Sequence, residues 1–158
     1  MANTQSMCTS FMGELMTATH NFGTAPIRAA STADTFKGAL YLASATINAS
    51  TTAYSATGEV TGTGYTAGGV TVTNATPPTA TNSSATAGVA YWTPSASLTY
   101  TSVTLTTAFD AVLIYNSTQS NKAVSVHTFG SQTITAGTFT LTMPSNTTST
   151  ALLRLATT

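Results

Sequence analysis

Hydrophobic residues in the second half of the chain alternate with threonine and serine, which is the two-residue period of a β-strand. The alternation runs through residues 98–105 and again through 124–129, and the almost continuously apolar run 109–115 lies between them. Such a run is typical of a central strand that is covered on both faces. The polar segment 116–121 predicts a turn, so we expect 124–129 to be the antiparallel partner of 109–115.

Shorter apolar segments predict the remaining strands. They are 36–42, 70–72, 89–92, one or two strands around Ile134, Phe139, Leu141 and Met143, and 151–155. Turn signals separate these segments, and short strands at such spacing indicate a sandwich, a jelly roll or a barrel. The fold class that we predict is all-β, a jelly-roll-like antiparallel β-sandwich of about eight strands with a short N-terminal helix.

One segment near the N-terminus has the period of a helix instead. Six residues recur at helical spacing, namely Cys8, Phe11, Met12, Leu15, Met16 and Thr19. They predict a short amphipathic helix over 8–19. This helix either closes one end of the sandwich, which we favour, or docks on a neighbouring subunit. We therefore divide the chain into an N-terminal arm with the helix, residues 1–23, and a single β-sandwich domain, residues 24–158.

Polar connections join these elements. Residues 24–34, 48–63 and 73–88 are rich in small and polar side chains and predict surface loops. The segment 62–69 contains four glycines and superficially resembles a phosphate-binding loop. It lacks the following Lys-Ser/Thr pair and the strand-to-helix context that such a loop needs. It therefore predicts a turn or bulge before the strand at 70–72.

The composition is unusual in its charge. Only eight of the 158 residues are charged, four acids and four bases, and threonine makes up about a quarter of the chain. Soluble domains normally devote about a quarter of their residues to charged side chains. Threonine is β-branched and suits the half-buried surface of a sheet, so the expected surface is neutral and rich in hydroxyl groups. Because like charges do not keep copies apart, we expect the chain to associate readily.

The same composition argues against two classes of partner. Nucleic-acid binding needs clustered basic residues, and here the four are far apart in sequence: Arg28, Lys37, Lys122 and Arg154. No apolar run approaches the ~20 residues of a membrane span, and the N-terminus has neither the basic region nor the apolar core of a signal peptide. We therefore expect no nucleic acid and no membrane partner, and synthesis in a cytoplasm.

Cys8 is the single cysteine, so the sequence offers no internal disulfide. Its apolar neighbours predict a buried thiol rather than a nucleophile, which needs a nearby base. No spacing ties either histidine to it. His20 follows the predicted helix and is expected to interact with its terminal carbonyls. His127 is expected at the surface or the edge of the core, on the strand face opposite the neighbouring valines.

A glycosidase needs two carboxylates across a cleft, and a metal site needs clustered ligands. The chain offers four carboxylates, widely separated in sequence: Glu14, Asp34, Glu59 and Asp110. We expect Asp110 to hydrogen-bond a turn or to pair with Lys122 across the hairpin. Tyr91, Trp92 and Tyr100 are candidates for a sugar-binding platform, although such residues belong more often to the core. We assign no catalytic, cofactor-binding or metal-binding residue, and we expect that the protein is not an enzyme.

Several stretches of the chain form a familiar combination. They are TFKGALY at 35–41, TAY at 52–54, GEVTGTGYTAGG at 58–69, LIYN at 113–116, NKAV at 121–124, CTSF at 8–11 and HNF at 20–22. Together they resemble a widespread family of small virion structural proteins of tailed bacteriophages, and the resemblance covers nearly the whole chain. The family pattern offers no functional residues to carry over.

The resemblance implies a role without enzymatic activity or cofactor. It indicates a capsid cement or decoration protein on the outer surface of the virion, made in the host bacterial cytoplasm. Such a protein forms a homo-oligomer, here a dimer or trimer, and stabilises the head shell by bridging the major capsid protein. The alternative is a tail-associated or fibre protein that contacts the host surface through the loops 48–63 and 73–88.

Overall fold

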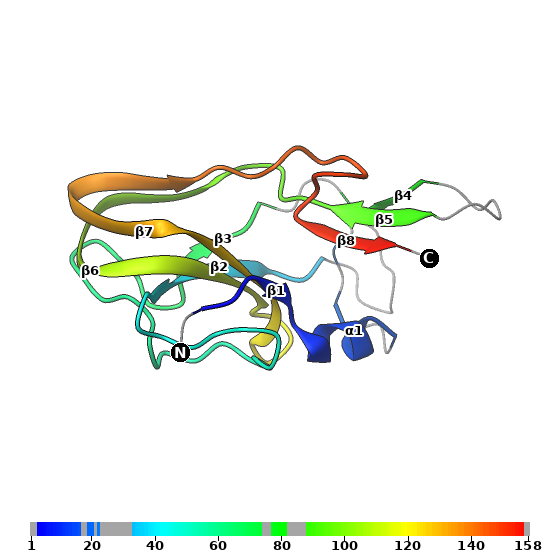
Figure 1. Cartoon of the computed structure of the whole chain (residues 1–158), viewed down its shortest axis with the longest axis horizontal. Helices are drawn as coiled ribbons and strands as arrows, with labels where there is room; N and C mark the ends of the chain where they lie inside the picture. The colour runs from blue at the N-terminus through cyan, green and yellow to red at the C-terminus, as the bar shows by residue number, and fades with distance from the viewer. Residues whose placement is uncertain are drawn as a thin grey trace.

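A computed structural model describes residues 3–16, 19–20, 22, 33–73, 77–81 and 88–156 of the chain. Its strands are β1 (Ser6–Met7), β2 (Phe36–Leu42), β3 (Val70–Thr71), β4 (Thr79–Ala80), β5 (Val89–Trp92), β6 (Leu98–Asn116), β7 (Lys122–Leu141) and β8 (Leu153–Ala156). All strand pairs are antiparallel and form two sheets, with the orders β1-β7-β6-β2-β3 and β4-β5-β8 (Figure 1). The predicted all-β character is confirmed.

The centre of the fold is one long hairpin of β6 and β7. The sequence pattern predicted several shorter strands here, but the structure joins them, because register shifts absorb the polar interruptions. One shift falls between Tyr100 and Val103, where Ser102 has a positive φ of 53°. Such bulges bend and twist a strand. Figure 1 shows both strands curving back, so that the two halves of the hairpin form facing layers.

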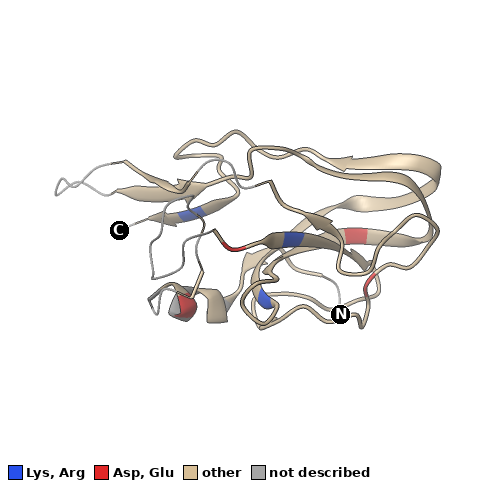
Figure 2. Cartoon of the chain, turned by 180° about the vertical axis from the view of Figure 1, so that it is seen from behind, with Lys and Arg blue, Asp and Glu red and all other residues tan. Residues whose placement is uncertain are grey.

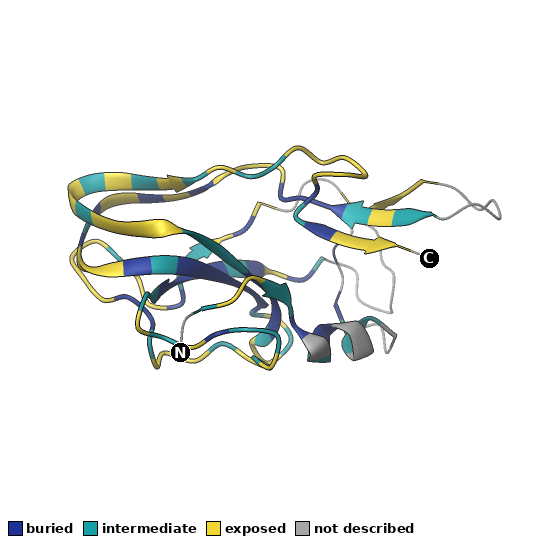
Figure 3. Ribbon diagram, viewed as in Figure 1, coloured by how far each residue is buried: buried dark blue, intermediate teal, exposed yellow. Residues whose placement is uncertain are grey.

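The facing layers enclose the core. Leu98 and Tyr100, at the start of β6, lie over Gly38 of β2 so closely that an added Cβ would come within 2.6 Å of the Leu98 side chain. The Tyr100 hydroxyl donates to the Gly38 carbonyl at 2.8 Å. The other half of β6 lies between β7 and β2, and its residues 111–116 are buried (Figure 3). The prediction of a doubly covered central strand at 109–115 is therefore confirmed.

The predicted turn at 116–121 connects the two long strands. Ser120 and Asn121 both have positive φ, 52° and 58°, and across them the Lys122 N–H donates to the Gln119 carbonyl at 3.1 Å. Asn116 closes this turn, because its side-chain oxygen accepts from the backbone N–H groups of Thr118 and Gln119, each at 3.1 Å.

The prediction of a surface connection over 48–63 is confirmed in large part, because all of its residues except Glu59 and Val60 are exposed or half-buried and no named strand lies there. The connection lies along the outer edge of β2, where the Val60 N–H donates to the Leu40 carbonyl and the Leu42 N–H donates to Gly58. Glu59 and Val60 are buried there. The sequence pattern missed this, because two adjacent buried residues in a polar segment fit neither a strand nor a helix period.

The glycine-rich segment 62–69 forms turns, as predicted. Gly64, Gly68 and Gly69 all have positive φ, a region that favours glycine. Gly69 also approaches the backbone of β2, since an added Cβ would lie 1.7 Å from the Gly38 carbonyl oxygen. The turn therefore brings β3 against β2 and covers the edge of the large sheet.

The prediction of a loop over 73–88 is wrong in part, because the short strand β4 lies within it. β4 pairs with β5 through only two residues, Thr79 and Ala80, and both are exposed. An exposed strand of two residues leaves no hydrophobic alternation to detect. Residues 74–76 and 82–87 lie outside the described part of the chain, as does most of the predicted loop 24–34.

Helix α1 (Thr9–Met16) lies within the predicted segment 8–19 and packs on its own domain. Phe11 is buried and contacts the rings of His20 and Phe22 edge-on, with centroids 4.8 and 5.9 Å apart. The preceding strand β1 pairs with β7, which continues the large sheet at its edge. The closing of one end of the sandwich by this helix stays a prediction; the structure shows α1 in contact with β7 of the same chain.

Candidate functional site

Glu59 is the most enclosed carboxylate of the large sheet. It is 5% exposed, and its two carboxylate oxygens accept three hydrogen bonds. Tyr54 Oη donates to Oε2 at 2.6 Å, while Tyr65 Oη and the Gly68 N–H donate to Oε1, each at 2.7 Å. We call these residues, with Tyr115, the Glu59 cluster. They bind the connection 48–63 and the glycine-rich turn to one buried charge.

The phenols of the Glu59 cluster are held as hydrogen-bond donors. Tyr65 Oη also accepts from the Leu40 N–H at 3.0 Å, and Tyr115 Oη donates to the Gly68 carbonyl at 2.8 Å. Burial raises the pKa of Tyr54, Tyr65 and Tyr115, to about 12 for Tyr115, and the nearby Glu59 charge raises each further. The phenols therefore stay protonated at neutral pH, and the cluster acts as a structural bond between loop and sheet.

A second polar cluster connects α1 to the hairpin turn. It consists of Glu14, His20, Asp34, Asn116 and Lys122, and we call it the His20 cluster. Asn116 Nδ2 donates to His20 Nδ1 at 3.0 Å and to Asp34 Oδ2 at 2.8 Å. His20 Nε2 lies 2.7 Å from Glu14 Oε2, and Lys122 Nζ donates to Glu14 Oε1 at 2.6 Å.

These contacts assign the charge states in the His20 cluster. An Nδ1 that accepts from an amide has no proton, so the proton of a neutral imidazole is on Nε2 and faces Glu14. Burial lowers the pKa of His20 against the opposing effect of Glu14. Burial raises the pKa of Glu14, but hydrogen bonds from Lys122 and His20 outweigh it, so the net pKa of Glu14 is lowered.

Two sequence predictions are wrong at these positions. His20 binds the side chains of Glu14 and Asn116 rather than the helix carbonyls that we expected. Lys122 pairs with Glu14 and not with Asp110, whose Oδ1 instead accepts from Asn3 Nδ2 at 2.6 Å. The N-terminal segment folds back onto the sheet through β1, and this long-range contact leaves no local signal in the sequence.

The remaining candidate nucleophiles are enclosed. Cys8 is fully buried, and burial, followed by the nearby Glu14 charge, raises the pKa of its thiol to about 11. Ser125 Oγ lies 2.8 Å from His127 Nε2, a serine–histidine contact that the sequence did not suggest. Ser125 is only 1% exposed, and burial lowers the pKa of His127 to about 4. Ser125 and His127 also line an open pocket of about 250 Å³ beside β1 and the start of β8, so this hydroxyl is buried in the wall of a pocket.

The aromatic candidates divide between core and surface. Trp92 and Tyr100 are buried and belong to the core, while Tyr91 is half-buried. Among the described residues, no three His, Cys, Asp or Glu side chains come together in a way that could hold a metal ion. Figure 2 shows the described acids and bases spread over separate elements, without a basic patch.

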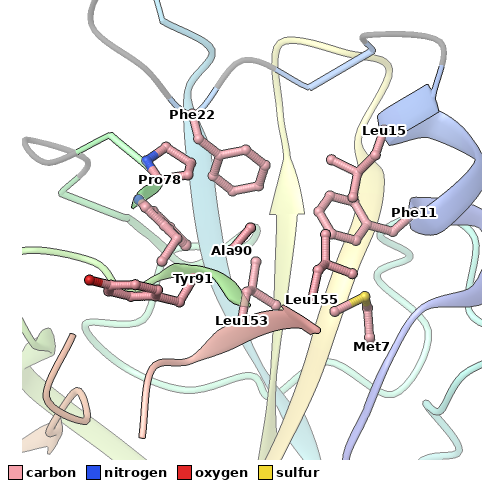
Figure 4. Close-up of a pocket in the computed structure, with 10 residues that line it drawn as sticks. Met7, Phe11, Leu15, Phe22, Pro78, Ala90, Tyr91, Leu153 and Leu155 are labelled. Atoms are coloured by element: carbon pink, nitrogen blue, oxygen red, sulfur yellow. The ribbon is translucent and has the colours of Figure 1, made fainter. Parts of the chain in front are cut away.

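A further surface feature is an apolar groove between α1 and one face of the small sheet (Figure 4). Its volume is about 80 Å³. It is lined by Met7, Phe11, Leu15, Phe22, Pro78, Ala90, Tyr91, Trp92, Leu153 and Leu155. Leu155 is 43% exposed, and within the described ranges it is the one large hydrophobic side chain in the exposed class. We call this surface the α1 groove and regard it as the candidate functional site.

The chain matches no family model, and no curated protein or solved structure is significantly similar to it. In the ranges that the structure describes, no helix has the length and apolar character needed to cross a bilayer. Arguments about function therefore depend on the residues of this chain, namely the two enclosed polar clusters, the neutral surface and the α1 groove.

Proposed function

We propose that this protein is a bacteriophage virion structural protein, a capsid cement or decoration protein that self-associates and bridges major capsid proteins on the head. One observation supports this most directly. The polar side chains that catalysis could use, in the Glu59 cluster, the His20 cluster and the Ser125–His127 pair, are engaged in contacts with one another. The surface offers hydroxyl groups and an apolar groove, which suit packing against other proteins rather than turnover of a substrate.

The segments that resemble the phage family occupy structural positions. Residues 58–69 contain Glu59, Tyr65 and Gly68, which seal the edge of β2. Residues 121–124 contain Lys122, which binds α1 to the hairpin through Glu14. These are the roles expected of residues that preserve a rigid domain, as a cement protein requires.

We further propose that the sandwich is jelly-roll-like. The curved β6–β7 hairpin supports this, because it supplies both facing layers of the core from one antiparallel ribbon. The two sheets have five and three strands, and the assignment of their strand order to a jelly roll is part of this proposal.

A bound cement protein would stabilise the shell by mass action, since a ligand that binds only the assembled state shifts the equilibrium towards it. The test has two parts. Immunogold labelling of purified particles should place many copies over the head. Particles that lack the protein should lose genome at lower temperature or lower ionic strength than complete particles. Label on the tail alone would replace this proposal with the tail or fibre role, and equal resistance of both particles would remove the stabilising role.

A further inference from the structure

Strand β8 is an edge of the small sheet. It pairs with β5 in an unbroken register from Val89 opposite Ala156 to Trp92 opposite Leu153. Within the described residues no strand pairs with its other side. The neighbouring β1 does not close this side, because an open pocket of about 250 Å³ lies between β1 and the start of β8. An edge with free N–H and C=O groups is a template for another strand.

Protected edges are very short or carry charges, prolines or bulges; β8 is short and has one charge, but it has no proline or bulge to prevent pairing. Its sequence is Leu153-Arg154-Leu155-Ala156, with one charge, no proline and no register shift. Leu155 lies on the same face as Leu153 and Ala90, towards the α1 groove (Figure 4). The groove is therefore open at the exposed edge, and a strand added there would cover Leu155.

We propose that the outer edge of β8 binds β8 of a second copy of this chain, antiparallel, with Leu155 opposite Leu155. The inference specifies the contact for the self-association in the proposed function, but it does not depend on the phage particle. Pairing would extend the small sheet through a two-fold axis, so that each copy buries the same residues. The two leucines would lie on the same face, between the two α1 grooves.

For a second copy as the occupant, the one charge of β8 disfavours an axis at Arg154, and exposure favours an axis at Leu155, which is 43% exposed, over one at the buried Leu153. In a two-fold pair about an axis normal to the sheet, opposite residues point to the same face, so the axis passes through a residue. An axis at Arg154 would place two guanidinium groups opposite each other, which is destabilising. An axis at Leu155 places Arg154 opposite Ala156 and matches leucine with leucine. The zero net charge of the chain adds no general repulsion between copies.

The first test uses the full purified chain in sedimentation equilibrium over a dilution series. The wild-type protein should be a dimer, and Leu155→Lys should weaken it at least tenfold, because it loses the apolar contact and places two ammonium groups opposite each other. Thr79→Lys is the matched control, since it adds the same charge at the other edge of the same sheet. Circular dichroism of each variant checks that the fold is retained.

The second test reads the register directly by mild oxidation. Leu155→Cys should give a covalent dimer on a non-reducing gel, because the new thiols face each other across the axis. Arg154→Cys should give little dimer, because it faces Ala156, and the native Cys8 is buried in every variant. A wild-type monomer or trimer, an unchanged dimer in Leu155→Lys, or stronger cross-linking from Arg154→Cys would overturn the inference. If the protein forms this dimer but immunogold labelling detects none of it on particles, the proposed function is refuted and the β8 contact still stands.

Discussion

Removing the carboxylate of Glu59 should destabilise the domain more than the loss of any other single acid contact described above. Glu59→Ala removes the acceptor for Tyr54, Tyr65 and the Gly68 N–H at once. The two tyrosines are half-buried and can turn towards water, but Gly68 is buried and its N–H loses its carboxylate partner. The variant thus removes the shared acceptor that holds Tyr54, Tyr65 and Gly68 together at the edge of β2.

The magnitude follows from the hydrogen bonds. A bond to a charged group contributes about 1.5–3 kcal/mol, and a buried group left without a partner costs about 1–3 kcal/mol. Partial solvation of the phenols reduces the sum, so we expect Glu59→Ala to cost about 3–5 kcal/mol of unfolding free energy. Tyr65→Phe should cost about 2–3 kcal/mol, because the Leu40 N–H also loses its acceptor. Tyr54→Phe removes one half-buried bond and should cost about 1 kcal/mol.

Urea unfolding followed by the fluorescence of the single, buried Trp92 measures these differences. Asp110→Asn is the matched control, because it removes the same charge from a carboxylate with one bond from Asn3, and it should cost less than about 1 kcal/mol. The reasoning fails if Glu59→Ala costs no more than the control, or if Tyr54→Phe is more damaging than Tyr65→Phe.

Three further predictions concern single sites. Burial lowers the pKa of His127 from 6.5 to about 4. As the pH falls, the imidazole is therefore protonated in the unfolded chain before it is protonated in the folded chain. This difference should lower the stability of the wild-type protein by at most about 3 kcal/mol between pH 6.5 and 4. In His127→Gln, the unfolding free energy measured by urea titration should lose this part of its dependence on pH. The prediction is wrong if the variant and the wild-type protein depend on pH equally. Gly69→Ala should cost at least about 3 kcal/mol, because its Cβ would meet the Gly38 oxygen at a positive φ, whereas Gly130→Ala has room and should be nearly neutral in the same assay. Cys8 should react with an aromatic disulfide reagent at least about a hundredfold faster in urea than in the native state, since its thiol is buried with a raised pKa; equal rates would refute this.

The local period of the sequence was sufficient to predict most strands, but not the full extent of the two long strands β6 and β7. The segments 36–42 and 89–92 match β2 and β5 residue for residue, because each alternates or is apolar throughout. In β6 the polar stretch around Thr106 and Thr107 suggested a break, yet the backbone continues through register shifts. A bulge keeps backbone pairing while it shifts the side-chain alternation, so a period of two cannot distinguish it from a loop.

The polar clusters were beyond local prediction for a different reason. His20 and Asn116 are 96 residues apart, and only the packing of α1 against the hairpin turn brings them together. The Glu59 cluster had a partial signal, since Glu59 is the one charge in a polar connection and has Tyr54 and Tyr65 nearby in sequence. That spacing gives no indication of burial, because burial depends on pairing with β2, which is decided by the whole sheet.

The scarcity of charge also determines how this chain stabilises its acids. Glu59 is bound by phenols and a backbone N–H, and Asp110 by the amide of Asn3, so neutral donors take the place of lysine or arginine at both positions. Neutral donors hold a carboxylate without adding a compensating positive charge at the surface. Contacts between copies would then depend on leucine and backbone pairing rather than on ion pairs. Because salt screens charge pairs but not apolar burial, self-association through β8 should persist at ionic strengths that dissociate charge-driven interfaces.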